Sequence, residues 1–182
     1  MSFSIDGKTV IVTGAANGIG AALARHFAEN DANVMCADID EKALKKDLGD
    51  SADDSNVRYF AGDLREKLTL ANLLSATVDA FDRVDVLVNA SRQMATTDPL
   101  DMDDETVEKL LQQNLMTSLR LSQMVAKRMI KQDQEQDHEF AGTIINLSSI
   151  AARLTQPELL AYSVSTAALE QMTRSMAVAL AK

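Results

Sequence analysis

Residues 8–20, KTVIVTGAANGIG, decide how the rest of the chain is expected to fold. The apolar run at 10–12 is rich in β-branched residues, which favours a strand. Three glycines follow, Gly14, Gly18 and Gly20, before an alanine-rich helical pattern begins. The stretch predicts a strand, a tight turn and a helix. The N-terminus of such a helix offers free backbone N–H groups to a phosphate.

The end of the next apolar run makes this prediction more specific. A glycine triplet alone also suits an ordinary turn between a strand and a helix. Here the run at 33–37 is followed by Asp38, which comes 18 residues after Gly20. In dinucleotide-binding units a carboxylate at about this distance accepts hydrogen bonds from the ribose hydroxyls. It would also repel a 2′-phosphate, so the pattern predicts NAD(H) rather than NADP(H).

The composition is that of a globular chain without a surface for nucleic acid. Of 182 residues, 46% are hydrophobic and 25% are charged, and the formal net charge is −9. This length and apolar content suffice for one domain with a substantial core, so we expect a single domain over residues 1–182. The acidic residues are spread along the chain, which disfavours binding to a nucleic acid backbone or an anionic membrane.

The sequence contains no pattern typical of export or of a metal cluster. No apolar run approaches the roughly 20 residues of a membrane span, and no signal-peptide pattern is present, so we expect a cytoplasmic protein. Cys36 is the only cysteine and is expected to be a buried, inert thiol. His26 and His138 share no ligand spacing, so we expect no metal site.

Apolar runs alternate with helical patterns along the whole chain. Strands are predicted at 10–12, 33–38, 57–61, 84–88 and 142–147, and the later helices at 41–48, 66–81, 103–131 and about 160–181. This alternation implies right-handed crossovers and a doubly wound parallel sheet with helices on both faces. We therefore predict a Rossmann-type α/β fold with five strands in the order 3-2-1-4-5, which would bind ligands beyond the carboxyl ends of its strands.

With these features the chain resembles the short-chain dehydrogenase/reductase family, the single-domain NAD(P)-dependent oxidoreductases of Rossmann type. The matching residues are Thr13-Gly14-x-x-x-Gly18-Ile19-Gly20, Asp38, Asp63-Leu64, Asn89, Asn114, Ser149 and Tyr162. They follow the family's order and span nearly the whole chain. The resemblance implies reversible hydride transfer between NAD and an alcohol or ketone substrate.

The resemblance also implies which residues bind the cofactor. The residues that would contact the diphosphate and its adjoining ribose are Gly14, Asn17, Gly18, Ile19 and Gly20. Asp38 would bind the adenosine ribose, and Asp63 with Leu64 would contact the adenine. Asn89 would lie beside the ribose on the nicotinamide side.

Three further residues resemble the family's catalytic groups. Tyr162 would pass a proton to the substrate oxygen, and Ser149, 13 residues earlier, would hold that oxygen. Asn114 interrupts the apolar side of the predicted helix 103–131 and would help to hold a water of a proton relay. Two structural alternatives are open: a partly exposed helix residue for Asn114, and a helix-start aromatic with a solvated hydroxyl for Tyr162.

One departure from the family pattern concerns catalysis directly. The family has Tyr-x-x-x-Lys, whereas this chain has Tyr162-Ser163-Val164-Ser165-Thr166. Loss of a matched acid/base group commonly costs on the order of 100- to 10,000-fold in rate. We therefore expect weak or lost activity. The alternative is a non-catalytic dinucleotide-binding or structural protein, or a piece with no function of its own.

Two other departures concern the substrate and the assembly. Arg92 stands where the family usually has glycine, and it would either crowd the site or bind an acidic group of the substrate. The family's sixth and seventh strands and substrate segment are expected to be absent from residues 1–182. The last helix is apolar around its whole circumference, so we expect it to be buried against the long helix and a second subunit, in a homodimer or homotetramer.

Overall fold

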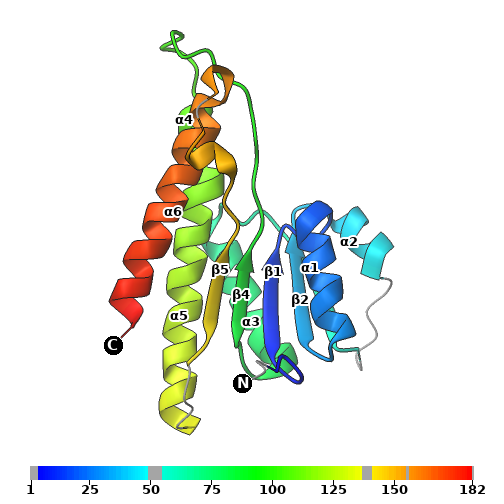
Figure 1. The fold of residues 1–182 in the computed structure, drawn as a ribbon. Helices are drawn as coiled ribbons and strands as arrows, with labels where there is room; N and C mark the ends of the chain where they lie inside the picture. Colours follow the sequence, from blue (N-terminus) through cyan, green and yellow to red (C-terminus); the bar gives the residue numbers. More distant parts are fainter. Residues whose placement is uncertain (1–3, 49–54, 137–140, 155, 182) are drawn as a thin grey trace. The chain divides into compact units, whose positions relative to one another are not determined.

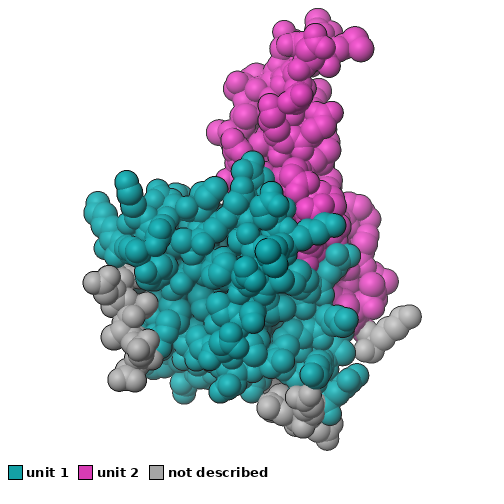
Figure 2. Space-filling model, turned by 180° about the vertical axis from the view of Figure 1, so that it is seen from behind, with its two compact units in different colours: residues 1–91, 121–145 teal, residues 92–120, 146–182 magenta. Residues whose placement is uncertain are grey.

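The structure, a computed structural model, describes residues 4–48, 55–136, 141–154 and 156–181. The chain divides into two compact units, coloured separately in Figure 2. Unit 1 comprises residues 1–91 and 121–145, and unit 2 comprises residues 92–120 and 146–182. The single domain over residues 1–182 stays a prediction.

Five strands form one sheet in the order β3-β2-β1-β4-β5, as the sequence predicts (Figure 1). They are β1 (Thr9–Thr13), β2 (Asn33–Asp38), β3 (Val57–Ala61), β4 (Val86–Asn89) and β5 (Thr143–Asn146). β1 pairs in parallel with both β2 and β4, and β2 pairs in parallel with β3. The predicted Rossmann-type α/β fold is therefore confirmed.

Helical segments separate the strands along the chain. They are α1 (Gly18–Glu29), α2 (Glu41–Leu48), α3 (Lys67–Phe81), α4 (Thr106–Leu110), the π-helical turn η1 (Leu111–Met116), α5 (Thr117–Gln136), the 3₁₀ turns η2 (Ile150–Ala152) and η3 (Pro157–Leu159), and α6 (Leu160–Leu180). All five residues of β1 are buried, and β1 lies in the middle of the sheet, between β2 and β4. A strand buried on both faces is expected to be a continuous apolar, β-branched run.

The core of unit 1 lies where α3 and α5 pack against the central strands. Ile11 and Leu87 are fully buried there. Their partners include Leu73 of α3 together with Leu121 and Val125 of α5, all likewise fully buried. This packing covers one face of the sheet, and it leaves the carboxyl ends of the strands to the loops that carry the candidate site residues.

A side chain distant in sequence sets the start of β4. The predicted strand covers 84–88, but the observed strand begins at Val86. Gln132, on α5, accepts the N–H of Val84 at 3.0 Å and donates to its carbonyl at 2.9 Å. Both backbone groups of Val84 are therefore bonded to a buried amide side chain and not to a neighbouring strand.

The predicted helix 103–131 is observed as three consecutive segments. Asp104 accepts the N–H of Thr106 at 2.8 Å, and α4 begins at Thr106. The π-helical turn η1 follows, and α5 then continues to Gln136. A π-helical turn is rare and occurs frequently at functional sites, so the interruption itself indicates where such a site is to be sought.

Cys36 and His26 lie within the described part of the chain. Cys36, in β2, has no exposed surface, which confirms that the thiol is buried, and burial raises its pKa to about 12. His26 is exposed on α1, whereas His138 lies outside the described residues. Within the described ranges no three metal-ligating side chains gather, and no helix is long and apolar enough to cross a membrane.

Burial along α6 differs from the expectation. Its buried residues are Ala161, Tyr162, Ser165, Thr166 and Leu169, all in the first half of the helix. Val178 is 77% exposed, and Val164 and Leu180 are also exposed. Among the described residues, the second half of α6 is mostly exposed, although Met172, Thr173 and Met176 are half-buried. Burial against a second subunit stays a prediction.

Candidate functional site

The turn after β1 packs tightly against the segment that follows β4. Gly14 has a φ of +69°, and a Cβ added to it would lie 2.8 Å from both the backbone N and the Cα of Ser91. The Thr13 hydroxyl accepts the N–H groups of Ala90 and Ser91, at 3.1 and 3.2 Å. Only glycine fits at position 14, because any side chain would push the two strand ends apart.

The N-terminus of α1 lies directly against this turn and leaves open space in front of it. A Cβ added to Gly20 would lie 2.0 Å from the Gly14 carbonyl oxygen, whereas one added to Gly18 would meet nothing within 4 Å. The Asn17 side chain makes no capping hydrogen bond, and Ile19 is exposed. The first N–H groups of a helix have no partner within it. The arrangement therefore suits the diphosphate that the sequence predicts.

Asp38, at the end of β2, is held against the glycine-rich turn. One carboxylate oxygen accepts the N–H of Ala16 at 3.1 Å, and the other accepts the N–H of Asp40 at 3.0 Å. The carboxylate is thus oriented by two backbone groups and remains partly accessible. A negative charge at the tip of β2 suits ribose hydroxyls and opposes a phosphate on the same ribose.

The residues after β3 contain a contact that the sequence did not predict. The Arg65 side chain and its own backbone N–H bind the carboxylate of Asp63, with Nε–Oδ1 and N–Oδ1 distances of 2.9 and 3.0 Å. The hydrogen bonds from Arg65 lower the pKa of Asp63 below its usual value. Leu64, which lies between these two residues in sequence, is buried. The bonds from Arg65 hold Asp63 beyond the end of β3 as an anion.

Asn89, the last residue of β4, is buried and donates to the Ser122 hydroxyl at 3.0 Å. It pairs with Thr13 across the β1–β4 ladder. Its side chain therefore connects the tip of the sheet to α5. Unit 1 thus holds every residue predicted to bind the cofactor, all of them at or directly beyond the carboxyl ends of β1 to β4.

In unit 2, Asn114 lies in the π-helical turn and is only 3% exposed, not partly exposed. Its amide accepts the N–H of Gln93 at 2.8 Å and donates to the carbonyl of Gln93 at 2.9 Å. It also donates to the Ser165 hydroxyl of α6 at 3.0 Å. One buried side chain thus joins the loop after β4 to α6, on which Tyr162 lies one turn earlier.

Tyr162 and Thr166 are neighbours on the buried side of α6. Tyr162 is 4% exposed and belongs to an apolar cluster with Leu110, Ala151 and Ala161. The Thr166 hydroxyl donates to the carbonyls of Tyr162 and Ser163, at 2.9 and 3.2 Å. The position of the family's lysine is therefore filled by a hydroxyl that is already bonded to its own helix.

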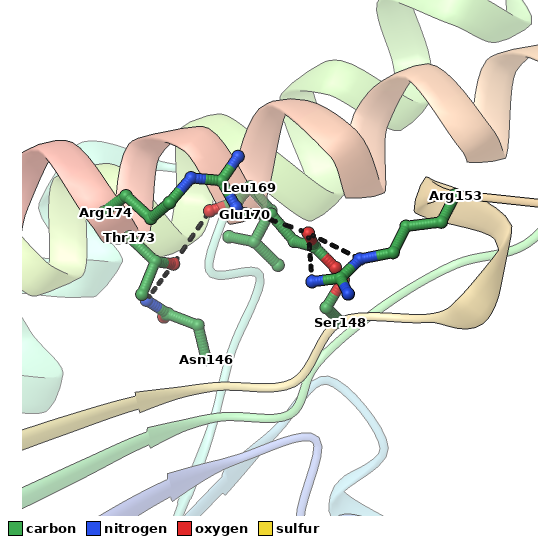
Figure 3. Close-up of a pocket in the computed structure, with 7 residues that line it drawn as sticks. All are labelled: Asn146, Ser148, Arg153, Leu169, Glu170, Thr173 and Arg174. Atoms are coloured by element: carbon green, nitrogen blue, oxygen red, sulfur yellow. Dashed lines mark hydrogen bonds and ion pairs between the residues drawn. The ribbon is translucent and has the colours of Figure 1, made fainter.

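The carboxyl end of β5 is attached to α6 by side-chain hydrogen bonds (Figure 3). Asn146 donates to the Thr173 hydroxyl at 3.0 Å, and the Ser148 hydroxyl donates to Glu170 at 3.2 Å. Ser149 follows, and its hydroxyl accepts the N–H of Ala151 at 3.2 Å, which caps the turn η2. Because Ala151 packs in the same cluster as Tyr162, the structure brings the Ser149 turn and Tyr162 together.

Seven residues around this attachment line a cavity of about 200 Å³. They are Asn146, Ser148, Arg153, Leu169, Glu170, Thr173 and Arg174. Arg153 and Arg174 both pair with Glu170, at 3.2 and 3.5 Å. Hydrogen bonds, first of all from Arg153, lower the pKa of Glu170 below its ordinary value of 4.5. The carboxylate thus holds the β5–α6 junction together as an anion.

The lowered pKa of Glu170 predicts a pH-dependent contribution to stability. A carboxyl whose pKa is lowered on folding stabilises the folded state above its unfolded pKa, and this contribution is lost as the pH falls through the lower folded value. We therefore expect Glu170→Gln to reduce the free energy of unfolding near neutral pH, with the reduction shrinking below pH 4.5. Urea unfolding at several pH values measures the effect. Glu158→Gln, an exposed site in η3, is the control, and an equal pH-dependent loss there would contradict the assignment.

Arg92, also in unit 2, extends toward the same strand end. Its guanidinium donates to the Ser148 carbonyl at 3.2 Å, while the side chain remains exposed. Sequence reasoning left two roles open for it and did not identify this anchor. It also missed Arg65, Glu170 and Ser165. For Ser165 a signal was present, because it follows Tyr162 by three residues and so shares its helix face.

Comparisons with known proteins agree with this geometry. Residues 8–182 match the sequence profile of the family described as short chain dehydrogenase. This chain belongs to the short-chain dehydrogenase family. An uncharacterized oxidoreductase of Thermotoga maritima is 32% identical to it over 179 residues, which are 98% of this chain and 67% of that protein. The recognition made from the motifs is therefore confirmed.

Two further relatives carry named activities. The NAD-dependent glycerol dehydrogenase of Listeria innocua is 28% identical, and the match covers 97% of this chain and 66% of that protein. A solved structure of a 7α-hydroxysteroid dehydrogenase complexed with NADH and 7-oxo glycochenodeoxycholic acid has a TM-score of 0.87 and 28% identity. It matches 97% of this chain, which covers 67% of that structure. The chain thus spans about two thirds of the length of these relatives.

Proposed function

We propose that this chain binds NAD(H) and transfers a hydride between the nicotinamide and an alcohol or ketone, at a rate that the absence of the lysine keeps low. The observation that carries the proposal is the turn after β1. There Gly18 leaves open space before the N-terminus of α1, and the Asp38 carboxylate is held beside the turn by the Ala16 N–H. Membership of the family supports the same reaction class.

The preference for NAD(H) over NADP(H) rests on charge. Both oxygens of Asp38 are oriented by backbone N–H groups, which supports the proposal that this carboxylate binds a ribose of the dinucleotide. Two relatives support this choice, since one is named NAD-dependent and the other is solved with NADH. Asp63, held by Arg65, and the buried Leu64 would contact the adenine, and Asn89 would lie near the second ribose.

Unit 2 supplies the groups for proton movement. A bound NAD supplies the hydride acceptor of the reaction. Tyr162 would then take the proton from the substrate hydroxyl, while Ser149 holds the substrate oxygen. Asn114 keeps the loop after β4 attached to α6 through Gln93 and Ser165, which holds Tyr162 in place. The partner we propose is a small alcohol or ketone, without nucleic acid or membrane.

A second candidate function is dinucleotide binding without turnover. It is favoured by Thr166, whose hydroxyl is bonded to the helix carbonyls of Tyr162 and Ser163 and which carries no charge. Under this alternative NADH binds normally, but substrates are not converted at a measurable rate.

We further propose that the protein is cytoplasmic and forms a homodimer or homotetramer through α5 and α6. Light scattering measures the assembly.

The proposal is tested first through cofactor preference. We expect the unmodified chain to bind NADH more tightly than NADPH, as measured by nucleotide fluorescence or calorimetry. Asp38→Ala should weaken NADH binding by about 10-fold, because it removes hydrogen bonds worth about 1 kcal/mol each, and should reduce the discrimination against NADPH. Asp38→Asn is the matched control, since it keeps the size of the side chain while it removes the charge and replaces one acceptor oxygen with an NH₂ donor.

Two results would contradict the proposal. If neither form of the nucleotide binds the unmodified chain, the proposed function is wrong. If NADH binds and Asp38→Ala leaves the ratio of the two affinities unchanged, the assignment of the carboxylate to the ribose is wrong.

A further inference from the structure

Arg92 is fixed at the start of the loop after β4 by contacts on both sides. Its own guanidinium donates to the carbonyl of Ser148, 56 residues away in sequence, at 3.2 Å. The backbone of the next residue, Gln93, is held at both its N–H and its carbonyl by the Asn114 amide. The Arg92 guanidinium and the backbone of the next residue are thus both bonded to residues of unit 2, while the Arg92 side chain itself is exposed.

The anchor places Arg92 beside the candidate catalytic serine. Ser148 immediately precedes Ser149, and the hydroxyl of Ser148 is directed away to Glu170. The carbonyl that accepts from Arg92 therefore belongs to the peptide that leads into Ser149. This relation involves residues of unit 2 alone.

The charge of Arg92 has no carboxylate partner within the described part of the chain. A guanidinium has five N–H donors in a planar fork, and the bond to a neutral carbonyl uses one of them. Three other arginines are paired with carboxylates: Arg65 with Asp63, Arg83 with Asp85 and Arg153 with Glu170. Arg92 thus presents an uncompensated cation in a protein whose net charge is −9.

We propose that Arg92 binds a carboxylate of the substrate, so that the substrates are hydroxy acids and the corresponding oxo acids. This inference rests on the proposed function. A carboxylate matches the guanidinium fork with two parallel N–H···O bonds. In the oxidation, the alcohol carbon gives a hydride to NAD⁺ and the hydroxyl proton leaves through Tyr162 to solvent. The products are an oxo acid and NADH.

The experiment compares acids with their neutral esters. The chain is saturated with NADH and titrated by calorimetry with 2-, 3- and 4-oxo acids and with the methyl ester of each. We expect at least one acid to bind roughly 10- to 100-fold more tightly than its ester, as is typical of a hydrogen-bonded charge pair. This preference should be lost in Arg92→Gln and partly restored in Arg92→Lys.

Arg174→Gln is the matched control, because it removes the same charge from an exposed arginine of unit 2 that already has a carboxylate partner. It should keep the preference for the acid. Circular dichroism verifies that the variants are folded.

Each remaining outcome has a defined meaning. If NADH binds and no acid is preferred over its ester, the inference is wrong while the proposed function stands. The inference is also wrong, and the proposed function still stands, if NADH binds but neither the acid nor its ester binds. The same conclusion follows if Arg92→Gln keeps the preference for the acid. If NADH itself does not bind, the proposed function is overturned and the inference with it.

Discussion

Thr166→Lys is expected to raise the turnover of alcohol substrates by roughly 100- to 10,000-fold over the unmodified chain, the range that a matched acid/base group commonly contributes. Residue 166 lies one helical turn after Tyr162, so the two side chains share a face of α6. A lysine there would place a positive charge near the tyrosine oxygen and stabilise the negative charge that develops when its proton leaves. The measurement is the initial rate of NADH formation with a panel of hydroxy acids and secondary alcohols.

Two controls separate charge from shape in this experiment. Thr166→Met introduces a long, uncharged side chain, and it should not raise the rate, although it also breaks the hydroxyl's bonds to the helix carbonyls. Tyr162→Phe, added to Thr166→Lys, should abolish the gained activity. If Thr166→Lys binds NADH and gains no turnover, the missing lysine is not what limits this chain.

Gly14→Ala should lower the free energy of unfolding by about 2 to 5 kcal/mol. The left-handed backbone at φ +69° costs a non-glycine residue roughly 1–2 kcal/mol. Overlap of the new Cβ with the Ser91 backbone, 2.8 Å away, adds about 1–3 kcal/mol, the usual cost of forcing extra atoms into a packed site. Urea unfolding measures the loss, and NADH titration of the folded fraction measures the damage to the turn.

Gly7→Ala is the matched control for this prediction. Gly7 has nearly the same backbone, with φ +67°, but an added Cβ would meet nothing within 4 Å. It should therefore show only the conformational cost of about 1–2 kcal/mol and no change in NADH affinity. If the two variants lose the same stability, the close approach of the strand ends does not constrain position 14.

Most of the fold could be predicted because its signals are local. The runs at 33–38 and 57–61 match β2 and β3 to the residue, since apolar β-branched stretches bounded by polar turns favour strands wherever they occur. The start of β4 could not be predicted in this way. It depends on Gln132, which lies 48 residues beyond Val84 in sequence.

The candidate site shows the same division. Gly14, Asp38 and Asn89 could be placed from the sequence, because the carboxyl ends of parallel strands lie along one edge of the sheet. Asn114 could be singled out as a polar residue among apolar ones, whereas the π-helical turn that contains it was not predicted. Its partners Gln93 and Ser165 lie 21 and 51 residues away, so their contacts become visible only in three dimensions.

The exposure of α6 illustrates another limit of sequence reasoning. Apolar side chains around the whole circumference of a helix predict that the helix is buried, but they do not identify which element or subunit covers it. Among the described residues, the fully buried side chains of α6 lie in its first half, and Val178 in the second half is exposed. Composition reports how much apolar surface an element carries, whereas the covering partner depends on how elements pair.

The sheltered thiol of Cys36 offers an experimental advantage. Alkylating reagents attack the thiolate, and a pKa of about 12 in the sheet interior leaves almost none of it at neutral pH. A second cysteine introduced at exposed Ser175 could therefore be labelled with a single dye while the protein stays folded. In the unmodified chain, the slow rate at which Cys36 is alkylated would report how often the sheet opens, with no engineered probe required.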